Sequence, residues 1–409
     1  MTDSIFKRYR EKRNTIARNK NILQTSYIPD QLPHRSKEID QIASVIAAAL
    51  SGEKPSNMMI FGKTGTGKTA VMKYIGNELK KEDACGGCEF VYINCQVTDT
   101  HYGILYTIGN PEQTDVDDRI PYTGWSTEKV FSKMREYIDS ENKIFIIVLD
   151  EIDKLLIKSG NDVLHHLLII NENLRNSKVS IVGISNNLKF TERMDSRVHS
   201  RFGGENMVFE PYTSEELEDI LRERVKLAFD EGSIEDGVIA YCAALSARET
   251  GDARRALDFL RVATDIAERN GDAVVTEAHV KSAKNKIEMN IVIEAIKTLT
   301  SQSKTVLMSI VKNTEEGSRT MTTGDVYTAY KSISDVLGTS VLTQRRVTDL
   351  ISELDMLGII YAPVRSYGKA GRTKEIELSA PKEAIDVLKE DELMKPLKKY
   401  RPPKQTTLM

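Results

Sequence analysis

The sequence predicts an α/β fold in which a parallel sheet is followed by a helical domain and then by a small domain of helices and a β-hairpin. Short apolar runs alternate with helical patterns up to about residue 209, and such alternation favours a parallel sheet covered by helices on both faces. A glycine-rich motif follows the first apolar run, and the strand pattern stops after residue 212. A length of 409 residues allows two or three domains at roughly 100–200 residues each.

The first domain should contain the sheet. Its expected strands are residues 58–61, 90–93, 144–149, 179–184 and 207–209. Ahead of them, apolar residues recur at helical spacing from about Arg35 to Leu50, and the polar, glycine- and proline-containing residues 51–55 end that helix. We assign this base domain to residues 26–210. Residues 1–25 combine many basic side chains with almost no apolar periodicity, which indicates a basic arm.

The rest of the chain should form two further domains. Residues 211–290 are expected to be a helical lid, with helices at 215–230, 234–246 and 253–269 and a linker at 284–290. Residues 291–390 show the pattern of a winged helix, with helices near 292–312, 322–337 and 343–357 and then two short strands around a basic, glycine-containing turn. Residues 391–409 are expected to be a solvated basic tail.

Composition excludes several classes of protein. Lysine and arginine (57) nearly balance aspartate and glutamate (60), so a uniformly basic nucleic-acid binder is excluded and an anionic partner must meet local patches. No apolar run approaches the roughly 18–20 residues that span a bilayer, and the N-terminus lacks the apolar core of a signal peptide. Four cysteines are too few for a disulfide scaffold. We expect a cytoplasmic protein without a membrane partner.

Cys85 and Cys88 have the spacing of metal ligands or of a redox pair. No second such pair and no neighbouring histidine pair completes a tetrahedral set. A polar loop is therefore expected here rather than a zinc site.

Residues 62–69 match the phosphate-binding pattern GxxxxGK[ST], and we call them the P-loop. The motif lies between an expected strand and an expected helix, which is the context that the pattern requires. Its glycines let backbone N–H groups surround phosphate oxygens at a helix N-terminus. Lys68 should reach the β and γ phosphates, and Thr69 should hold Mg²⁺. The nucleotide-binding residues expected in this loop are Gly65, Thr66, Gly67, Lys68 and Thr69.

Two carboxylates, Asp150 and Glu151, end an apolar strand. Both should therefore lie at the carboxyl edge of the sheet, where ligands of α/β proteins bind. Asp150 suits a role in holding Mg²⁺, and Glu151 can polarise an attacking water. Together with the P-loop, these residues indicate a site for ATP or ADP with Mg²⁺.

Two further polar groups are expected near a γ-phosphate. Asn186 ends the fourth strand with an amide that could orient the attacking water. Arg254 and Arg255 lie in the first turn of an expected helix, and one of them could close onto the phosphates as two domains come together. An ordinary strand-end turn and a solvated helix face are the alternative readings.

The helix expected from Thr343 has the layout of a DNA-recognition helix. Val347, Leu350, Ile351 and Leu354 define its core face at about 100° per residue. Thr343 is a plausible N-cap. The side chains expected to face major-groove edges and phosphates are Gln344, Arg345, Arg346 and Thr348. A charged, solvated face of a small helical domain is the alternative.

The hairpin after that helix carries the second group of expected DNA contacts. These residues are Arg365, Lys369, Arg372 and Lys374. Positive charge on a slim hairpin suits the minor groove and the phosphates of double-stranded DNA. Each neutralised phosphate should add roughly 0.9 to the salt slope of binding.

Taken together, these motifs resemble those of the AAA+ ATPases, and more narrowly those of the origin-recognition-complex (ORC) type replication initiators of archaea. The resemblance runs from residue 28 to about residue 388. Its marks are residues 32–35, the P-loop, Asp150-Glu151, residues 184–186, 197–202, 211–213, 251–257 and 371–375.

The resemblance implies roles for particular residues. Asn186 would be sensor 1, and Arg254 would be sensor 2 with Arg255 facing elsewhere. Arg201 resembles an arginine finger that acts on ATP in a neighbouring subunit, with Arg197 as the competing candidate. Tyr212 and Arg224 would border the nucleotide from the lid, and His34 and Arg35 would flank the adenine. Residues 101–125 resemble the place of a further DNA contact, by Arg119 or by residues 122–125.

The resemblance also implies a function. It is that of an ATP-binding initiator in the archaeal nucleoid that recognises double-stranded origin DNA and helps recruit or load the replicative helicase, with further initiator subunits possible. Its ATPase activity, ATP and water giving ADP and phosphate, would be weak and would serve as a switch. Two alternatives share these motifs: a protein-remodelling AAA+ ATPase, and an ATP-gated regulator of transcription or plasmid partition.

Overall fold

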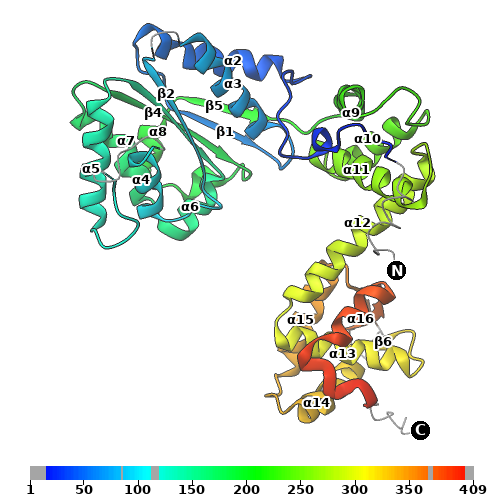
Figure 1. Ribbon diagram of the computed structural model, residues 1–409. Helices are drawn as coiled ribbons and strands as arrows, with labels where there is room; N and C mark the ends of the chain where they lie inside the picture. The colour runs from blue at the N-terminus through cyan, green and yellow to red at the C-terminus, as the bar shows by residue number, and fades with distance from the viewer. Residues whose placement is uncertain (1–14, 84–85, 112–118, 367–371, 401–409) are drawn as a thin grey trace, which may run out of the picture. The chain divides into compact units, whose positions relative to one another are not determined.

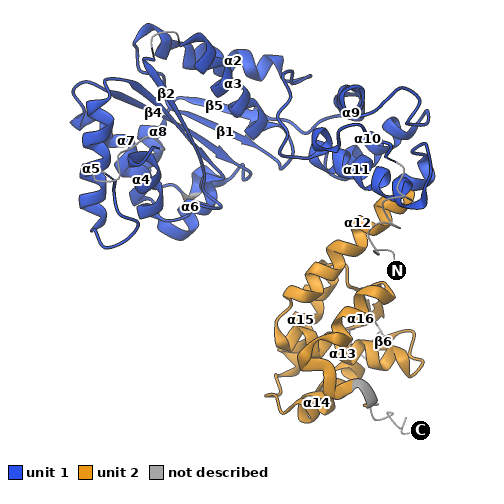
Figure 2. Ribbon diagram, viewed as in Figure 1, with its two compact units in different colours: residues 1–280 blue, residues 281–409 orange. Residues whose placement is uncertain are grey.

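The computed structural model describes residues 15–83, 86–111, 119–366 and 372–400 (Figure 1). The chain divides into two compact units, residues 1–280 and 281–409 (Figure 2). The boundary falls within helix α12, Glu277–Thr298. Among the described residues, no helix is long and apolar enough to cross a membrane.

Unit 1 contains a parallel five-stranded sheet with the order β2-β3-β4-β1-β5. Its strands are β1 (Met58–Gly62), β2 (Cys88–Asn94), β3 (Ile144–Asp150), β4 (Lys178–Ser185) and β5 (Glu205–Phe209). All neighbouring strands pair in parallel, which confirms the predicted sheet. Strand β1 leads into the P-loop and lies between β4 and β5, so the P-loop opens at the carboxyl edge beside the ends of β3 and β4.

Helices cover both faces of this sheet (Figure 1). On one face lie α2 (Ser36–Ile46) and α3 (Lys68–Glu82), and on the other lie α4 (His101–Gly109), α5 (Thr127–Ser140), α6 (Ile152–Ser159), α7 (Asp162–Ile169) and α8 (Ser196–Phe202). Side chains of the fully buried strand β3 alternate between the two cores, with Ile146 on the side of α2 and α3 and Ile147 on the other. Short 3-10 helices complete this part at Ala47–Ser51, Ile170–Asn173 and Phe190–Arg193.

The helical part of unit 1 follows the sheet, and we call it the lid. It consists of α9 (Ser214–Ala228), α10 (Val238–Glu249) and α11 (Ala253–Asn270). Part of the expected basic arm packs on the lid, because Ile16, Ala17, Ile22 and Leu23 are buried there and the 3-10 helix Lys20–Leu23 contacts α9 and α11. Four apolar residues in so short a segment do not produce a periodic pattern, and basic neighbours conceal them.

Unit 2 forms around its own apolar core and has the helices and hairpin of a winged helix. After α12 its elements are α13 (Ser301–Glu315), β6 (Met321–Thr322), α14 (Thr323–Leu337), α15 (Gln344–Met356), β7 (Ile360–Tyr361), β8 (Val364–Ser366), β9 (Arg372–Leu378), α16 (Lys382–Glu390) and a 3-10 helix, Glu392–Lys399. Strand β9 pairs antiparallel with β6, β7 and β8.

Three sequence expectations differ from the structure in this region. Residues 284–290 are helical within α12 rather than a linker, because they contain helix formers and neither glycine nor proline. The helix expected near 292–312 is divided at Leu299 and Thr300, where Thr300 caps α13. Part of the expected solvated tail packs on unit 2, since Met394 and Leu397 are buried.

Candidate functional site

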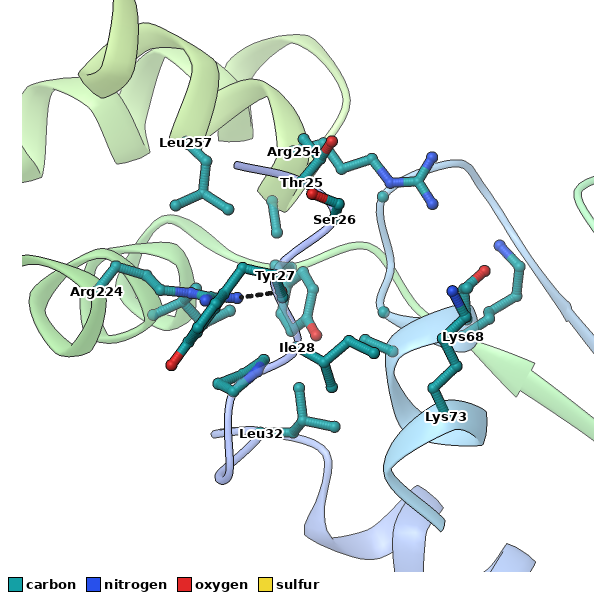
Figure 3. Close-up of a pocket in the computed structure, with 18 of the residues that line it drawn as sticks. Thr25, Ser26, Tyr27, Ile28, Leu32, Lys68, Lys73, Arg224, Arg254 and Leu257 are labelled. Atoms are coloured by element: carbon teal, nitrogen blue, oxygen red, sulfur yellow. Dashed lines mark hydrogen bonds between the residues drawn. The ribbon is translucent and has the colours of Figure 1, made fainter. Parts of the chain in front are cut away.

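A cavity in unit 1 lies where the sheet domain meets the lid (Figure 3). Its walls are the P-loop with α3, the carboxyl ends of β3 and β4, the lid helices α9 and α11, and residues 25–33. The predicted site residues that line it are Gly65, Gly67, Lys68, Thr69, Asp150, Glu151, Asn186, Tyr212, Arg224 and Arg254. The fold thus gathers residues from well-separated motifs around one space.

The P-loop has the backbone that its glycines allow. Gly65 and Gly67 have φ values of 75° and 91°, in the left-handed region that side chains disfavour. Gly67 is the N-cap of α3, so the first amides of that helix are free of intrahelical partners. Thr66, the remaining predicted residue of the loop, does not line the cavity and donates its hydroxyl to the Lys63 carbonyl.

Lys68 lies buried in the floor of the cavity. Its Nζ donates to the carbonyl oxygens of Gly62, at 2.8 Å, and of Lys63, at 2.7 Å. Burial lowers the pKa of Lys68 to about 8, and the nearby carboxylate of Asp150 opposes that shift only in part. A buried ammonium of this kind is a strong partner for phosphate oxygens.

Asp150 is the hub of the polar contacts at the end of β3. Its Oδ2 accepts a hydrogen bond of 2.6 Å from Thr69 Oγ1 and another of 2.6 Å from the hydroxyl of Tyr92. A hydroxyl and a carboxylate side by side are oxygen donors of the kind that Mg²⁺ prefers. The donor set therefore fits a magnesium ion.

Glu151 has a strained backbone. Its φ of 56° and ψ of 41° place it in the left-handed region, which is uncommon for a residue other than glycine. Its amide donates to Asp150 Oδ1 at 2.9 Å. Such conformations persist where the surrounding structure enforces them, and they concentrate at functional sites.

The start of lid helix α11 lies directly on the P-loop. The amide of Ala253 donates to the carbonyl of Gly65 at 3.2 Å, and the carboxylate of Asp252 caps α11. Arg254 lines the cavity, whereas Arg255 forms an ion pair with Glu249. The two adjacent arginines therefore differ in their surroundings.

Arg35 is buried against the P-loop and does not line the cavity. Its guanidinium donates to the Thr66 carbonyl at 3.0 Å and to the Tyr212 hydroxyl at 3.1 Å, and it lies 3.9 Å from the Tyr212 ring centroid. His34 pairs with Asp219 at 2.9 Å and also lies outside the lining. That these two residues flank adenine stays a prediction.

Several lining residues were not singled out in the sequence. Tyr27 lies against Arg224, whose guanidinium donates to the Tyr27 carbonyl and lies 4.7 Å from its ring centroid (Figure 3). Among the others of this group are Thr25, Ser26, Ile28, Leu32, Lys73, Ile220 and Leu257. Most are uncharged, so no charge pattern marked them, although Leu32 and Leu257 lie within the motifs that carry the family resemblance.

Arg197 and Arg201 lie on α8, away from the lining of the cavity. Arg197 pairs with Asp195 at 2.8 Å, and Arg201 pairs with Glu172. Both guanidinium groups remain substantially exposed, so a second molecule could reach them.

In unit 2, helix α15 has the predicted layout. Thr343 is its N-cap, and the expected core residues Val347, Leu350, Ile351 and Leu354 are all buried. Gln344, Arg345 and Arg346 are exposed, while Thr348 is partly buried and donates to the Gln344 carbonyl. Arg346 lies 3.8 Å from Asp349 and 3.9 Å from Glu353, whereas no carboxylate among the described residues pairs with Arg345.

The hairpin of β8 and β9 docks on the same helix. Lys374 Nζ donates to Ser352 Oγ at 2.8 Å, and Arg365 pairs with Glu375 at 2.7 Å. Arg372 opens β9 opposite Ser366. The predicted contact Lys369 lies outside the described residues.

Helix α4, His101–Gly109, occupies the first part of the segment 101–125. Tyr122 is exposed, and Trp125 packs against the core with the Lys129 ammonium over its ring. Its acidic stretch, residues 112–118, lies outside the described residues.

Family models match three consecutive parts of the chain. Residues 58–208 match the ATPase family associated with various cellular activities (AAA), residues 218–285 match the Cdc6 AAA+ ATPase-type lid domain, and residues 294–387 match the CDC6 C-terminal winged helix domain. The ORC1-type DNA replication protein 1 of Methanosarcina mazei is 48% identical over 98% of this chain and 96% of its own. The corresponding protein of Thermococcus kodakarensis is 50% identical over 96% and 95%.

The chain belongs to the ORC1-type DNA replication proteins. The solved structure of the Aeropyrum pernix ORC1 protein in complex with DNA is 42% identical, with a TM-score of 0.78 over 94% of this chain and 99% of that one. Cdc6p of Pyrobaculum aerophilum, at 21% identity and a TM-score of 0.59, shares the fold. Membership of the AAA ATPases implies that this ORC1-type protein binds a nucleotide.

Proposed function

We propose that this ORC1-type protein is a replication initiator that binds double-stranded origin DNA through unit 2 and is switched by ATP in unit 1. The observation that carries the proposal is the presence, in one chain, of a cavity lined by the P-loop and the lid and of a helix, α15, with an exposed basic first turn. Relatives that match nearly the whole chain are named DNA replication proteins.

The cavity residues have complementary roles in this proposal. The P-loop amides and Lys68 would bind the phosphates of ATP or ADP, with Lys68 moving from the loop carbonyls to phosphate oxygens. Thr69 and Asp150 would hold Mg²⁺, which neutralises phosphate charge when bound. Glu151 would polarise the attacking water. Asn186 and Arg254 would lie beside the γ-phosphate as sensor 1 and sensor 2. Hydrolysis would be slow and would act as a switch.

The DNA contacts would come from α15 and the hairpin. The solved relative from Aeropyrum pernix is an ORC1 protein in complex with DNA. Gln344, Arg345 and Arg346 are exposed at the start of α15, where a recognition helix meets base edges. The hairpin residues Arg365, Lys369, Arg372 and Lys374 would contact phosphates or the minor groove.

Other partners follow from the same surfaces. Arg201, or alternatively Arg197, would act on ATP held by a neighbouring initiator subunit, because neither lines its own cavity. We include recruitment or loading of the replicative helicase in the proposal on the family resemblance. The site of action would be the archaeal nucleoid.

The deciding experiment compares the affinities of the full-length protein for origin duplex and for random duplex at physiological salt. We expect the origin to bind at least 10³-fold more tightly, as specific binders typically do. The Arg345→Ala/Arg372→Ala double variant should lose that preference while its nucleotide affinity stays unchanged. Equal affinity of the wild type for both duplexes would reject origin recognition. Rapid, partner-stimulated turnover by stable rings without DNA preference would favour a remodelling ATPase instead.

A further inference from the structure

One wall of the nucleotide cavity is attached to the lid rather than to the sheet domain. Residues 15–33, which we call the N-terminal strap, run from the lid to the start of α2 at Ser36. The first part of the strap lies on the lid, where Ala17 pairs with Phe229 and the Asn19 amide donates to the Ala228 carbonyl. Its second part, residues 25–33, supplies that wall. The position of the wall therefore depends on how the strap is held.

Glu268 of α11 pins the first part of the strap. Its side chain is 1% exposed. Oε1 accepts the amide of Ile16 at 3.1 Å and that of Ala17 at 3.4 Å, and Oε2 accepts Lys20 Nζ at 2.6 Å. Burial opposes ionisation, but Lys20 and the two amides hold the pKa of Glu268 below its usual value. Glu268 is thus an ionised, buried carboxylate that accepts hydrogen bonds from the strap.

Further contacts connect the part of the strap held by Glu268 to the part that lines the cavity. Ile22 and Leu23 are buried against the lid, so the strap cannot slide freely between Lys20 and the cavity wall. Arg224 then donates to the carbonyls of Ile22 and Tyr27, at 3.2 Å each, and so spans both parts of the strap. A shift at Ile16 and Ala17 is therefore communicated to Tyr27 through ordered backbone.

We propose that Glu268 is a positioning residue for nucleotide binding, which it controls without touching the nucleotide by holding the N-terminal strap in place as a wall of the cavity. This inference rests on the proposed nucleotide function of the cavity. When the wall is already ordered in the free protein, less conformational entropy is lost as the nucleotide binds. Removing the hydrogen bonds between Glu268 and the strap therefore weakens nucleotide affinity. Because coupling between two equilibria is reciprocal, bound nucleotide must also tighten the strap on the lid.

The test uses full-length Glu268→Ala, Glu268→Gln and a control, Asp258→Asn, which alters a carboxylate of the same helix whose described partner is Arg261. Affinity for a fluorescent ADP analogue with Mg²⁺ is measured together with hydrogen exchange of peptides covering residues 15–24. We expect Glu268→Ala to speed exchange there and to weaken binding about tenfold. Glu268→Gln keeps an oxygen acceptor for the amides and should be intermediate, and Asp258→Asn should match the wild type.

A second measurement tests the same coupling in the opposite direction and does not depend on whether any variant at Glu268 folds. In the wild type, saturating ADP should slow exchange across residues 15–24, whereas in Lys68→Ala the same ADP concentration should not. Unchanged exchange in the nucleotide-bound wild type, or a released strap with wild-type affinity in Glu268→Ala, would overturn the role of Glu268. Failure of the wild type to bind the analogue at all would overturn the proposed nucleotide function, and this inference with it.

Discussion

The hydroxyl of Tyr92 donates a 2.6 Å hydrogen bond to Asp150 Oδ2, the same oxygen that accepts from Thr69. Tyr92 lies on β2, next to β3 in the sheet, so two adjacent strands bring the phenol and the carboxylate together. Burial raises the pKa of Tyr92, and its hydrogen bond to Asp150 raises it further, which keeps the phenol a donor. Asp150 is thereby held in one orientation, with its Oδ2 toward Thr69.

We predict that Tyr92→Phe weakens the response of nucleotide binding to Mg²⁺. Removing the donor leaves Asp150 free to rotate, and loss of such an orienting partner typically costs a metal site about tenfold in affinity. The measurement is a Mg²⁺ titration of binding of a fluorescent ATP analogue. Tyr74→Phe, which changes a partly buried tyrosine of α3 in the same apolar core, is the control. An unaltered Mg²⁺ midpoint in Tyr92→Phe would contradict the orienting role.

Lys68→Ala and Glu151→Gln should separate binding from hydrolysis. Lys68 carries the buried ammonium of the P-loop, so its removal should reduce nucleotide affinity by tenfold or more. Glu151→Gln keeps the size of the side chain and removes its basicity, so binding should persist while turnover falls about 10²-fold or more. Equilibrium binding and phosphate release are measured on both variants. Normal turnover by Glu151→Gln would show that Glu151 does not activate the water.

Gly65→Ala should disrupt the contact between the P-loop and the lid. Gly65 has a φ of 75°, and a Cβ there would lie 1.6 Å from Asp252 Oδ1, so the cap of α11 must move. Nucleotide affinity should fall at least tenfold. Gly52→Ala is a matched control, because Gly52 has the same φ and nothing within 4 Å of its Cβ position. The control should lose only about 1–2 kcal/mol of stability to backbone strain. Equal nucleotide affinity of the two variants would contradict the steric argument.

The sequence predicted the elements whose signals are local. The P-loop, the carboxylates at the end of β3 and the core face of α15 each follow from spacing within one segment, and the structure has a strand before the P-loop, a helix after it and a buried face on α15. Tyr92 carried no such signal, because its contact with Asp150 depends on which strands are neighbours. Glu268 carried no local signal either, since its strap partners lie about 250 positions earlier in the chain.

Charge pairing explains a further difference between sequence and structure. The basic residues of the hairpin looked alike as a cluster, but Arg365 is paired with Glu375 and Lys374 is bound to Ser352. Arg345 has no carboxylate partner among the described residues. Arg345 and Arg365 therefore differ before DNA binds, because only the charge of Arg365 is already paired with a described carboxylate.

This difference gives a prediction for DNA binding by the single variants Arg345→Ala and Arg365→Ala. Arg345 can give its full charge and its donors to DNA, whereas Arg365 must first weaken its pair with Glu375. If Arg345 contacts a base edge, Arg345→Ala should cost about 1–3 kcal/mol of discrimination for the origin. If it contacts a phosphate, the salt slope should fall by roughly 0.9 for all sequences. Arg365→Ala should change both quantities less.

The measurement is binding of origin and random duplexes at several salt concentrations, with fluorescence anisotropy as the readout. Comparing the two duplexes separates a base contact from a phosphate contact, because only the former depends on sequence. A larger effect of Arg365→Ala than of Arg345→Ala would show that the Arg365–Glu375 pair opens at little cost on DNA. The hairpin, rather than the first turn of α15, would then carry most of the binding energy.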